Sequence, residues 1–189
     1  MDSAPASSSQ PWQLHDRFLE IRSPWMTLFG EHLQDQQGKI LEYWRIEKAD
    51  SVIVLSIQGD LFLLPAPSYR PGVGQATLDF PGGRISPNQT PQQAAIATLQ
   101  RELGVTEDTV TQLYPLNIQG WAVNSSFSNQ KLYSFVALID NHFDLLAEPS
   151  IGTYPTHSSG VCQLLQELTC LQCRSVLLEW LTQKTVQQE

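Results

Sequence analysis

The residues with the clearest chemical potential lie in one stretch, PGGRISPNQTPQQAAIATLQRELGV, at positions 81–105. It combines a glycine turn, a helix and a glycine stop, an order that is typical of the active-site segment of an enzyme. Its only charged residues are Arg84, Arg101 and Glu102. Metal-dependent hydrolysis requires several carboxylates around the ion. The stretch therefore has the layout of an active-site segment but too few acids for metal-dependent hydrolysis.

Local signals define the helix in this stretch. Thr90 is a favourable N-cap, Pro91 suits the first helical position, and Gln93 completes a capping box three residues after the cap. The alanine-rich run that follows favours a helix, and Gly104 ends it. A strand with the sequence ATLDF leads into the Pro-Gly-Gly turn, which makes a tight loop with an exposed backbone.

Apolar periodicity predicts the remaining elements. Residues 12–47 alternate apolar and polar positions in RFLEIR and ILEYWRIE, which predicts an extended N-terminal lobe. The run SVIVLSIQGDLFLL, at 51–64, predicts two strands joined by a turn at Gln58-Gly59-Asp60. KLYSFVALI predicts a later strand. The apolar stripe of residues 161–184 predicts one amphipathic helix.

Composition restricts the class of protein. A chain of 189 residues is long enough for one domain with a small appendage. The net charge of −8 argues against a nucleic acid as partner. There is no apolar run long enough for a bilayer and no signal-peptide pattern, so no membrane contact is expected. Three cysteines are too few for a disulfide framework and favour a cytoplasmic location.

With these residues in place, the chain resembles the Nudix hydrolases, and within them the ADP-ribose pyrophosphatase-like branch. The family motif is G-x5-E-x7-R-E-U-x-E-E-x-G-U, where U is aliphatic. With Gly83 at its first position, Leu99, Gly104 and Val105 fall on the U, G and U positions without a gap. The stretches LEYWRIEKADSVIVLSI, LLPAPSYRPGVGQATLDFPGG and SSFSNQKLYSFVALI extend the likeness over roughly residues 12–140.

The resemblance implies an α/β fold, a Nudix-type α/β/α sandwich around a mixed β-sheet. A small N-terminal β lobe and a C-terminal amphipathic helix are expected beside it. The expected division is a disordered tail at 1–11, the β lobe at 12–47 and a Nudix-like domain at 48–189. In ADP-ribose pyrophosphatases such a lobe often builds a dimer, so a homodimer through residues 12–47 is expected.

The motif positions that should hold a metal ion depart from the family pattern. Ala97 stands where the motif has Arg, and Gln89 where it has its outer Glu. Thr98 and Arg101 replace two of the three helix glutamates, so Glu102 alone remains as catalytic and metal-binding residue. Arg101 also adds a fixed positive charge where a divalent ion should bind. Asp79 could add one oxygen, whereas the loop at 124–131 has no carboxylate.

The resemblance also implies a set of substrate-binding residues. Tyr69 and Arg70 match a family position that helps to hold a nucleotide. Gly82 and Gly83 of the glycine turn are expected to bind substrate as well, and so is Arg84, which lies just beyond the turn. Together with Arg101, these cations could hold a diphosphate without metal, because a guanidinium pairs bidentately with phosphate oxygens. In the alternative interpretation, Arg101 is an exposed helix residue and Glu102 is solvated beside it.

Two functions are therefore open. In the first, the chain has lost or severely weakened Mg²⁺-dependent hydrolysis, requires no cofactor, and acts as a nucleotide-sugar-binding or interaction module. In the second, it is an active Nudix hydrolase that uses Mg²⁺ or Mn²⁺ to cleave the pyrophosphate of a nucleoside-diphosphate-linked substrate such as ADP-ribose. Both predict the same scaffold and a nucleotide-type small-molecule ligand.

The cysteines offer a weaker candidate site. Cys170 and Cys173 form a C-x-x-C pair, and Cys162 lies upstream. In a continuous helix with a rise of about 1.5 Å per residue, Cys162 and Cys173 would stand about 16 Å apart, too far to share a zinc ion. We therefore expect the three cysteines to pack as small hydrophobic side chains.

Overall fold

A computed structural model describes residues 11–145 and 150–186, and they divide into two compact units. The first unit contains the described part of residues 1–48 together with residues 124–130. The second contains residues 49–123 and the described part of 131–189. The tail expected at 1–11 lies outside the described residues, except for Pro11.

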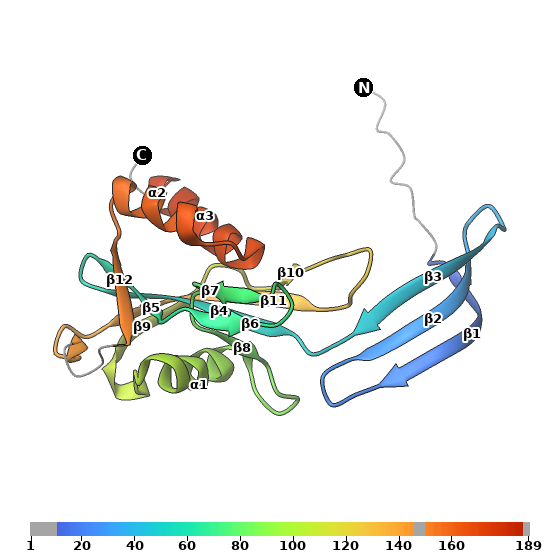
Figure 1. The fold of residues 1–189 in the computed structure, drawn as a ribbon, viewed down its shortest axis with the longest axis horizontal. Helices are drawn as coiled ribbons and strands as arrows, with labels where there is room; N and C mark the ends of the chain where they lie inside the picture. Colours follow the sequence, from blue (N-terminus) through green and yellow to red (C-terminus); the bar gives the residue numbers. More distant parts are fainter. Residues whose placement is uncertain (1–10, 146–149, 187–189) are drawn as a thin grey trace, which may run out of the picture. The chain divides into compact units, whose positions relative to one another are not determined.

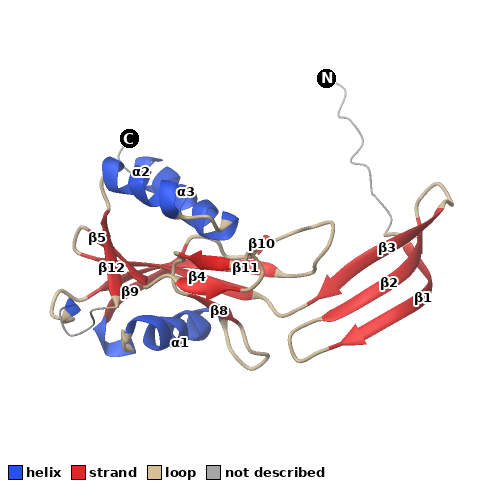
Figure 2. Ribbon diagram, viewed as in Figure 1, coloured by secondary structure: helices blue, strands red, loops and turns tan. Residues whose placement is uncertain are grey.

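The first unit is an antiparallel sheet of three strands in the order β1-β2-β3 (Figure 2). The strands are β1 (Gln13–Arg22), β2 (Thr27–Gln34) and β3 (Ile40–Glu47). The alternating runs RFLEIR and ILEYWRIE fall in β1 and β3, as expected. The central strand β2 was not among the expected strands, because its sequence TLFGEHLQ interrupts the apolar pattern with Gly30 and Glu31.

A buried carboxylate organises this sheet. Glu31 accepts hydrogen bonds from Arg17 Nη2 at 2.7 Å and from Arg45 Nε at 2.8 Å. Both guanidinium groups also lie over the ring of Phe29, at 3.9 and 4.5 Å from its centroid. The hydrogen bonds from Arg45, and then those from Arg17, lower the pKa of Glu31 against the opposing effect of burial. The buried carboxylate of Glu31 in β2 is therefore paired with two guanidinium groups.

Residues 124–130 complete the first unit by lying along β3. The backbone N–H of Ile46 donates to the carbonyl of Phe127 at 2.8 Å. The N–H of Lys48 donates to Asn129 Oδ1 at 2.9 Å. The Nudix-like domain expected at 48–189 includes this segment, whereas in the structure it groups with the first unit. The reason is that these hydrogen bonds join it to residues about 80 positions earlier in the chain.

The second unit is built on a mixed sheet of seven strands. Its main path is β10 (Trp121–Ala122), β11 (Lys131–Ile139), β4 (Ser51–Gln58), β5 (Leu61–Pro65) and β12 (Ile151–Pro155). The strand β8 (Gly82–Arg84) pairs with β4, and β9 (Val110–Pro115) pairs with β11. Only the β11–β4 pair is parallel among these described strands. A separate hairpin is formed by β6 (Ser68–Arg70) and β7 (Gln75–Thr77).

Helices cover both faces of this sheet (Figure 1). α1 (Pro91–Leu103) lies on one face, and α2 (Ser158–Glu167) and α3 (Leu171–Val186) lie on the other. Successive side chains of β4 point to opposite faces, so Val52 and Val54 pack in the core under α1. Ile53 and Leu55 pack in the core under α2 and α3. The expected α/β/α sandwich around a mixed sheet is confirmed.

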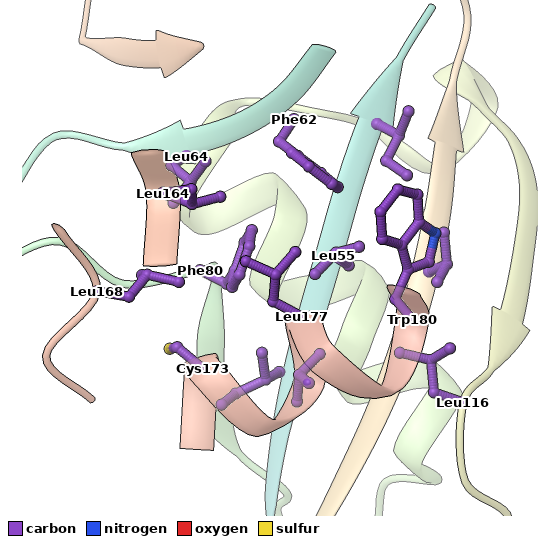
Figure 3. Packing of buried hydrophobic residues seen from close by; sticks show 14 of the residues in the cluster. Leu55, Phe62, Leu64, Phe80, Leu116, Leu164, Leu168, Cys173, Leu177 and Trp180 are labelled. Carbon is purple, nitrogen blue, oxygen red and sulfur yellow. The ribbon is translucent and has the colours of Figure 1, made fainter. Parts of the chain in front are cut away.

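The core under α2 and α3 is the larger of the two described clusters and is rich in aromatic and leucine side chains. Phe62 lies 5.0 Å from Trp180 and 6.2 Å from Phe80, measured between ring centroids, in edge-to-face geometry. Leu55, Leu164 and Leu177 fill the space around these rings (Figure 3). Cys173 lies at the same core and is buried, as expected for that residue.

The ends of α1 agree with the sequence signals. Thr90 Oγ1 accepts from the N–H of Gln93, and the Gln93 side chain accepts from the N–H of Thr90. Gly104 ends the helix with φ at 69°, in the left-handed region that favours glycine. The turn between β4 and β5 is also as expected, with Gly59 at φ 55°. A short 3₁₀ helix at Glu107–Thr109 follows α1.

The single helix expected at 161–184 is two helices in the structure. Leu168 caps α2 with extended backbone at ψ 114°, and residues 168–170 separate α2 from α3. The Leu168 side chain is buried, which favours turning the chain at this point. Arg174 on α3 donates to the carbonyl oxygens of Leu165 and Leu168, so the end of α2 remains hydrogen-bonded. The apolar stripe continues across the break, and for this reason periodicity did not reveal it.

None of the helices in the described chain combines the length and the apolar character that crossing a membrane requires.

We expect Glu31→Ala to destabilise the three-stranded sheet by about 2 kcal/mol, because it removes charged hydrogen bonds from two arginines. Urea unfolding followed by tryptophan fluorescence measures the loss. The pKa of Glu31 is depressed in the folded state, so this stabilisation is present above its unfolded pKa. It disappears as the pH falls through the folded pKa, and wild type and variant should then converge.

Glu47→Ala is the matched control, since Glu47 also pairs with Arg45 but its side chain is 48% exposed. An exposed pair contributes about 0–1 kcal/mol. Equal losses in the two variants would contradict a special role for the buried carboxylate.

Candidate functional site

The glycine turn is fixed between the central sheet and α1. Gly82 and Gly83 lie in β8 opposite Ile53 and Val52 of β4. A Cβ atom on Gly83 would stand 2.7 Å from Thr98 Oγ1 and 3.0 Å from an Arg101 nitrogen. Only a glycine fits this close approach of backbone to helix. The turn and the functional face of α1 therefore form one rigid unit.

At the centre of this unit, Arg101 and Glu102 hold the turn together. The Nη2 group of Arg101 donates to the carbonyl of Gly82 at 2.9 Å and to Glu102 Oε1 at 2.8 Å. The second oxygen of Glu102 accepts from the N–H of Gly82 at 3.1 Å. The guanidinium thus lies between the carbonyl and the carboxylate. The alternative interpretation is correct that Arg101 is exposed, at 55% of its side chain, but Glu102 is hydrogen-bonded through both oxygens and is not simply solvated.

The residues at the family's metal-binding positions do not fit a magnesium ion. Mg²⁺ requires about six hard oxygen ligands in octahedral geometry. Glu102 supplies the only carboxylate at the motif positions, and both of its oxygens already accept hydrogen bonds. Thr98 is buried beneath Gly83, and the Gln89 side chain accepts from the N–H of Ser86 at 3.3 Å. The positive charge at this part of the helix is therefore the guanidinium of Arg101.

Tyr69 and Arg70 lie on the β6–β7 hairpin, and both are exposed. The Tyr69 side chain is exposed, and Arg70 Nε donates to Asp79 Oδ2 at 3.0 Å. The same carboxylate oxygen accepts from Thr77 Oγ1 at 2.8 Å. Asp79, considered above as a metal ligand, is therefore an anchor for the hairpin. Arg70 and Thr77 both precede the Pro-Gly-Gly turn, whereas a third partner of Asp79, the thiol of Cys173, lies on α3.

The structure thus places the expected site residues in two groups. Gly82, Gly83, Arg101 and Glu102 contact one another directly. Tyr69 and Arg70 form the second group on the β6–β7 hairpin, where Arg70 pairs with Asp79. Arg84 lies at the end of β8, opposite Ser51 of β4.

The loop that could have supplied a further acid does not do so. Residues 124–130 belong to the first unit, where Phe127 and Asn129 bind the backbone of β3. The hydroxyl of Tyr43 also donates to the carbonyl of Ser126. This stretch has no carboxylate, and its polar groups instead form hydrogen bonds within the first unit.

Sequence reasoning missed one cluster of reactive groups. The thiols of Cys170 and Cys173 and the carboxylate of Asp79 lie with their ligand atoms within 4.8 Å of one another. The expectation that all three cysteines pack as hydrophobic side chains is correct for buried Cys173 only, since Cys162 is exposed and Cys170 is half-buried. The signal in the sequence was the C-x-x-C spacing of Cys170 and Cys173. The continuous helix expected at 161–184 excluded only a zinc ion shared with Cys162, so the pair was not considered by itself.

Comparisons with known proteins agree with the geometry. No family model matches the chain. An uncharacterised Nudix hydrolase of Schizosaccharomyces pombe is 27% identical over 104 residues, covering 48% of this chain. The chain spans about half of that relative, with 50% of its length covered.

A solved structure gives broader coverage. The crystal structure of an ADP compounds hydrolase matches 96% of this chain and 98% of its own, with a TM-score of 0.75 and 21% sequence identity. That similarity shows the fold, and the yeast relative supports it in sequence. The expected α/β/α fold is therefore confirmed, and the sequence similarity to a Nudix hydrolase over about half of the chain agrees with the expected resemblance to that family.

Proposed function

We propose that this chain is a cytosolic Nudix-fold protein that binds a nucleoside-diphosphate-linked compound, such as ADP-ribose, and has lost or severely weakened Mg²⁺-dependent hydrolysis. The observation that carries this proposal is the position of Arg101. Its guanidinium lies between the Gly82 carbonyl and the Glu102 carboxylate, the two oxygen donors that the turn and helix would offer to a metal ion.

Electrostatics supports the loss of metal binding. Two unit charges 4 Å apart interact by about 4 kcal/mol at an effective dielectric near 20. Replacing a glutamate by Arg101 converts an attraction of this order for a divalent ion into a repulsion. The Arg101 side chain is 55% exposed, so solvent screening reduces the effect without changing its sign.

Unused hydrogen-bond donors support the binding part of the proposal. In the described chain, Arg70 engages its partner through Nε, which leaves the two terminal nitrogens of its guanidinium for a ligand. Arg101 engages its partners through Nη2. A planar guanidinium presents five donors and suits phosphate oxygens. Exposed Tyr69 next to Arg70 adds an aromatic surface on which a base could stack.

The second candidate is an active hydrolase acting on the same class of compound. The observation in its favour is the similarity along nearly the whole chain to a structure described as an ADP compounds hydrolase. In this candidate, Glu102 would be the surviving metal ligand and Mg²⁺ or Mn²⁺ would be the cofactor. The two candidates share a ligand class and differ in metal dependence.

We expect Arg101→Glu to create measurable Mn²⁺ binding that the wild type lacks. The change removes the competing guanidinium and adds a second carboxylate, and at least a 10-fold gain in affinity follows from the charge difference. Titration of free Mn²⁺ by electron paramagnetic resonance measures it. Arg101 is the better target because Thr98 is buried against Gly83 and a glutamate there risks misfolding.

Arg101→Gln is the matched control, since it removes the positive charge without adding a carboxylate, and it should give a smaller gain. The same samples are then assayed for AMP release from ADP-ribose with Mg²⁺ or Mn²⁺. Wild-type release at the level of the blank supports the proposal. Metal-dependent release by the wild type that disappears in Glu102→Gln would establish the active hydrolase instead.

We expect the wild type to bind ADP-ribose in the presence of EDTA, and Arg70→Ala to weaken that binding about 10-fold, the effect of one charged hydrogen bond. Isothermal titration calorimetry measures both affinities. Arg22→Ala serves as control, because Arg22 is an exposed arginine of the first unit whose partner is Glu20. Absence of heat with ADP-ribose, ADP-glucose and related nucleotide sugars would reject the binding module.

We also propose that the three-stranded sheet pairs with a second copy of this chain. Large apolar side chains remain exposed on it within the monomer, among them Phe18 and Trp44, whose rings lie 5.4 Å apart. Further exposed apolar residues of this unit are Trp12, Leu14, Ile21, Trp25, Met26 and Ile40. An apolar surface of this extent is typical of a protein interface.

We expect light scattering to give about twice the 21.2 kDa chain mass at micromolar concentration. The double variant Phe18→Ser, Trp44→Ser should shift the mass to that of one chain, because it removes the aromatic pair from the contact. Ile118→Ser, at an 85% exposed position of the second unit, should leave the mass unchanged. A wild-type monomer would contradict the dimer.

A further inference from the structure

The break between α2 and α3 creates a chemical site that a continuous helix would not have. Cys170 precedes the first residue of α3, Leu171, so its thiol lies at the positive end of that helix. Cys173 lies one turn further on and is buried in the core. Cys170 is half-buried and therefore accessible from one side. This combination of an accessible thiol and a buried one suits dithiol chemistry.

Asp79 is the third member of the cluster. The thiol of Cys173 donates to Asp79 Oδ1 with the sulfur 3.7 Å from the oxygen. Asp79 Oδ2 is held by Arg70 Nε at 3.0 Å and Thr77 Oγ1 at 2.8 Å, which fix the direction of the carboxylate. The reactive atoms of all three side chains lie within 4.8 Å of one another. A positioned proton acceptor therefore contacts the buried thiol.

We propose that Cys170 and Cys173 form a reversible intramolecular disulfide, with Asp79 as the base for the buried thiol and a small-molecule disulfide as the oxidant. The site is separate from Arg101 and Glu102, and the inference does not depend on the function proposed above. A disulfide between two cysteines three residues apart is compatible with the Cα separation of a first helical turn.

The reaction proceeds in two balanced exchange steps. In the first, the Cys170 thiolate attacks one sulfur of glutathione disulfide, forming a mixed disulfide and releasing one glutathione thiolate. In the second, Asp79 takes the proton of Cys173, whose sulfur attacks Cys170 Sγ and releases the second glutathione. The protein loses two electrons and two protons overall, and one glutathione disulfide becomes two glutathione thiols.

The electrostatics of the two thiols supports their different roles. The single thiol hydrogen of Cys173 can reach either Asp79 Oδ1 or the sulfur of Cys170. When it is donated to Cys170, this hydrogen bond and those from the backbone N–H groups of Cys173 and Gln172 lower the pKa of Cys170 to about 6. The contact with Cys170 and burial raise the pKa of Cys173. At neutral pH, Cys170 is the nucleophile, whereas Cys173 needs a base to react.

A metal ion is the less suitable occupant of this cluster. Tetrahedral zinc requires four ligands, and the described residues supply three here. Both oxygens of Asp79 already accept hydrogen bonds, one from Cys173 and the other from Arg70 and Thr77. Disulfide formation leaves the Asp79 contacts with Arg70 and Thr77 intact, whereas zinc would compete for the same carboxylate.

The test uses the full-length reduced protein, equilibrated with mixtures of reduced and oxidised glutathione, quenched in acid and alkylated. All three cysteines share one tryptic peptide, so cleavage after Glu167 and Glu179 is used to separate Cys162 from the pair. We expect the 168–179 peptide to be two hydrogens lighter and unalkylated in oxidising mixtures. Dithiothreitol should restore two alkylated thiols.

Two cysteine variants decide between a specific disulfide and general oxidation. Cys162→Ser should leave the 170–173 disulfide unchanged, whereas Cys170→Ser, at a half-buried position, should abolish it. In the reduced wild type, iodoacetamide should modify Cys170 at least about 10-fold faster than Cys162 at pH 7, because the lowered pKa of Cys170 makes it largely thiolate. Equal rates for the two, or two free thiols at 170 and 173 under oxidising conditions, would overturn the proposal.

The role of Asp79 has its own readout. Asp79→Asn should slow the second step at least about 10-fold, so that glutathione bound to Cys170 accumulates. Asp108→Asn is the control, because it removes an exposed carboxylate that lies outside this cluster. No accumulation in Asp79→Asn would exclude the carboxylate as the base. One equivalent of tightly bound Zn²⁺ that blocks oxidation would overturn the disulfide in favour of a metal site.

Discussion

The position of the Arg101 guanidinium, between the Gly82 carbonyl and the Glu102 carboxylate, is the interaction on which the rest of the site depends. A glycine turn packed against a helix leaves oxygen donors that need a positive partner. In a metal-dependent hydrolase, ions supply that charge. Here a side chain of the helix supplies it, so the turn is held in place by the protein alone.

The central strand β4 explains why this arrangement is rigid. Its side chains enter the two cores alternately, and its backbone pairs with β5, β8 and β11. The turn at Gly82 and Gly83 is thus hydrogen-bonded directly to the buried strand β4. α1 packs over the same strand, and Thr98 closes the remaining space beneath Gly83. A change in the position of Thr98 or of the turn would therefore disturb a close-packed core, whereas the Arg101 side chain itself is 55% exposed.

Asp79 connects parts of the second unit that are distant in sequence. Through Arg70 and Thr77 it anchors the β6–β7 hairpin, and through Cys173 it contacts α3. One carboxylate thereby joins a proposed ligand-binding surface to a pair of thiols. Residues 124–130 make a comparable long-range connection in the first unit, where their polar groups pair with the backbone of β3.

Local signals sufficed for much of the fold. The caps at Thr90 and Gly104, the turn at Gly59 and the run of β11 are each encoded within a few residues, and the gapless motif spacing indicated the family resemblance. Strand β2 was missed because Glu31 is buried by partners 14 residues away on either side. The contacts of Arg101 and of the Asp79–Cys173 pair join residues 19 and 94 positions apart. The residue types of the site were thus readable from the sequence, but its charge pairing was decided by tertiary structure, because hydrogen bonds and burial depend on which distant groups meet.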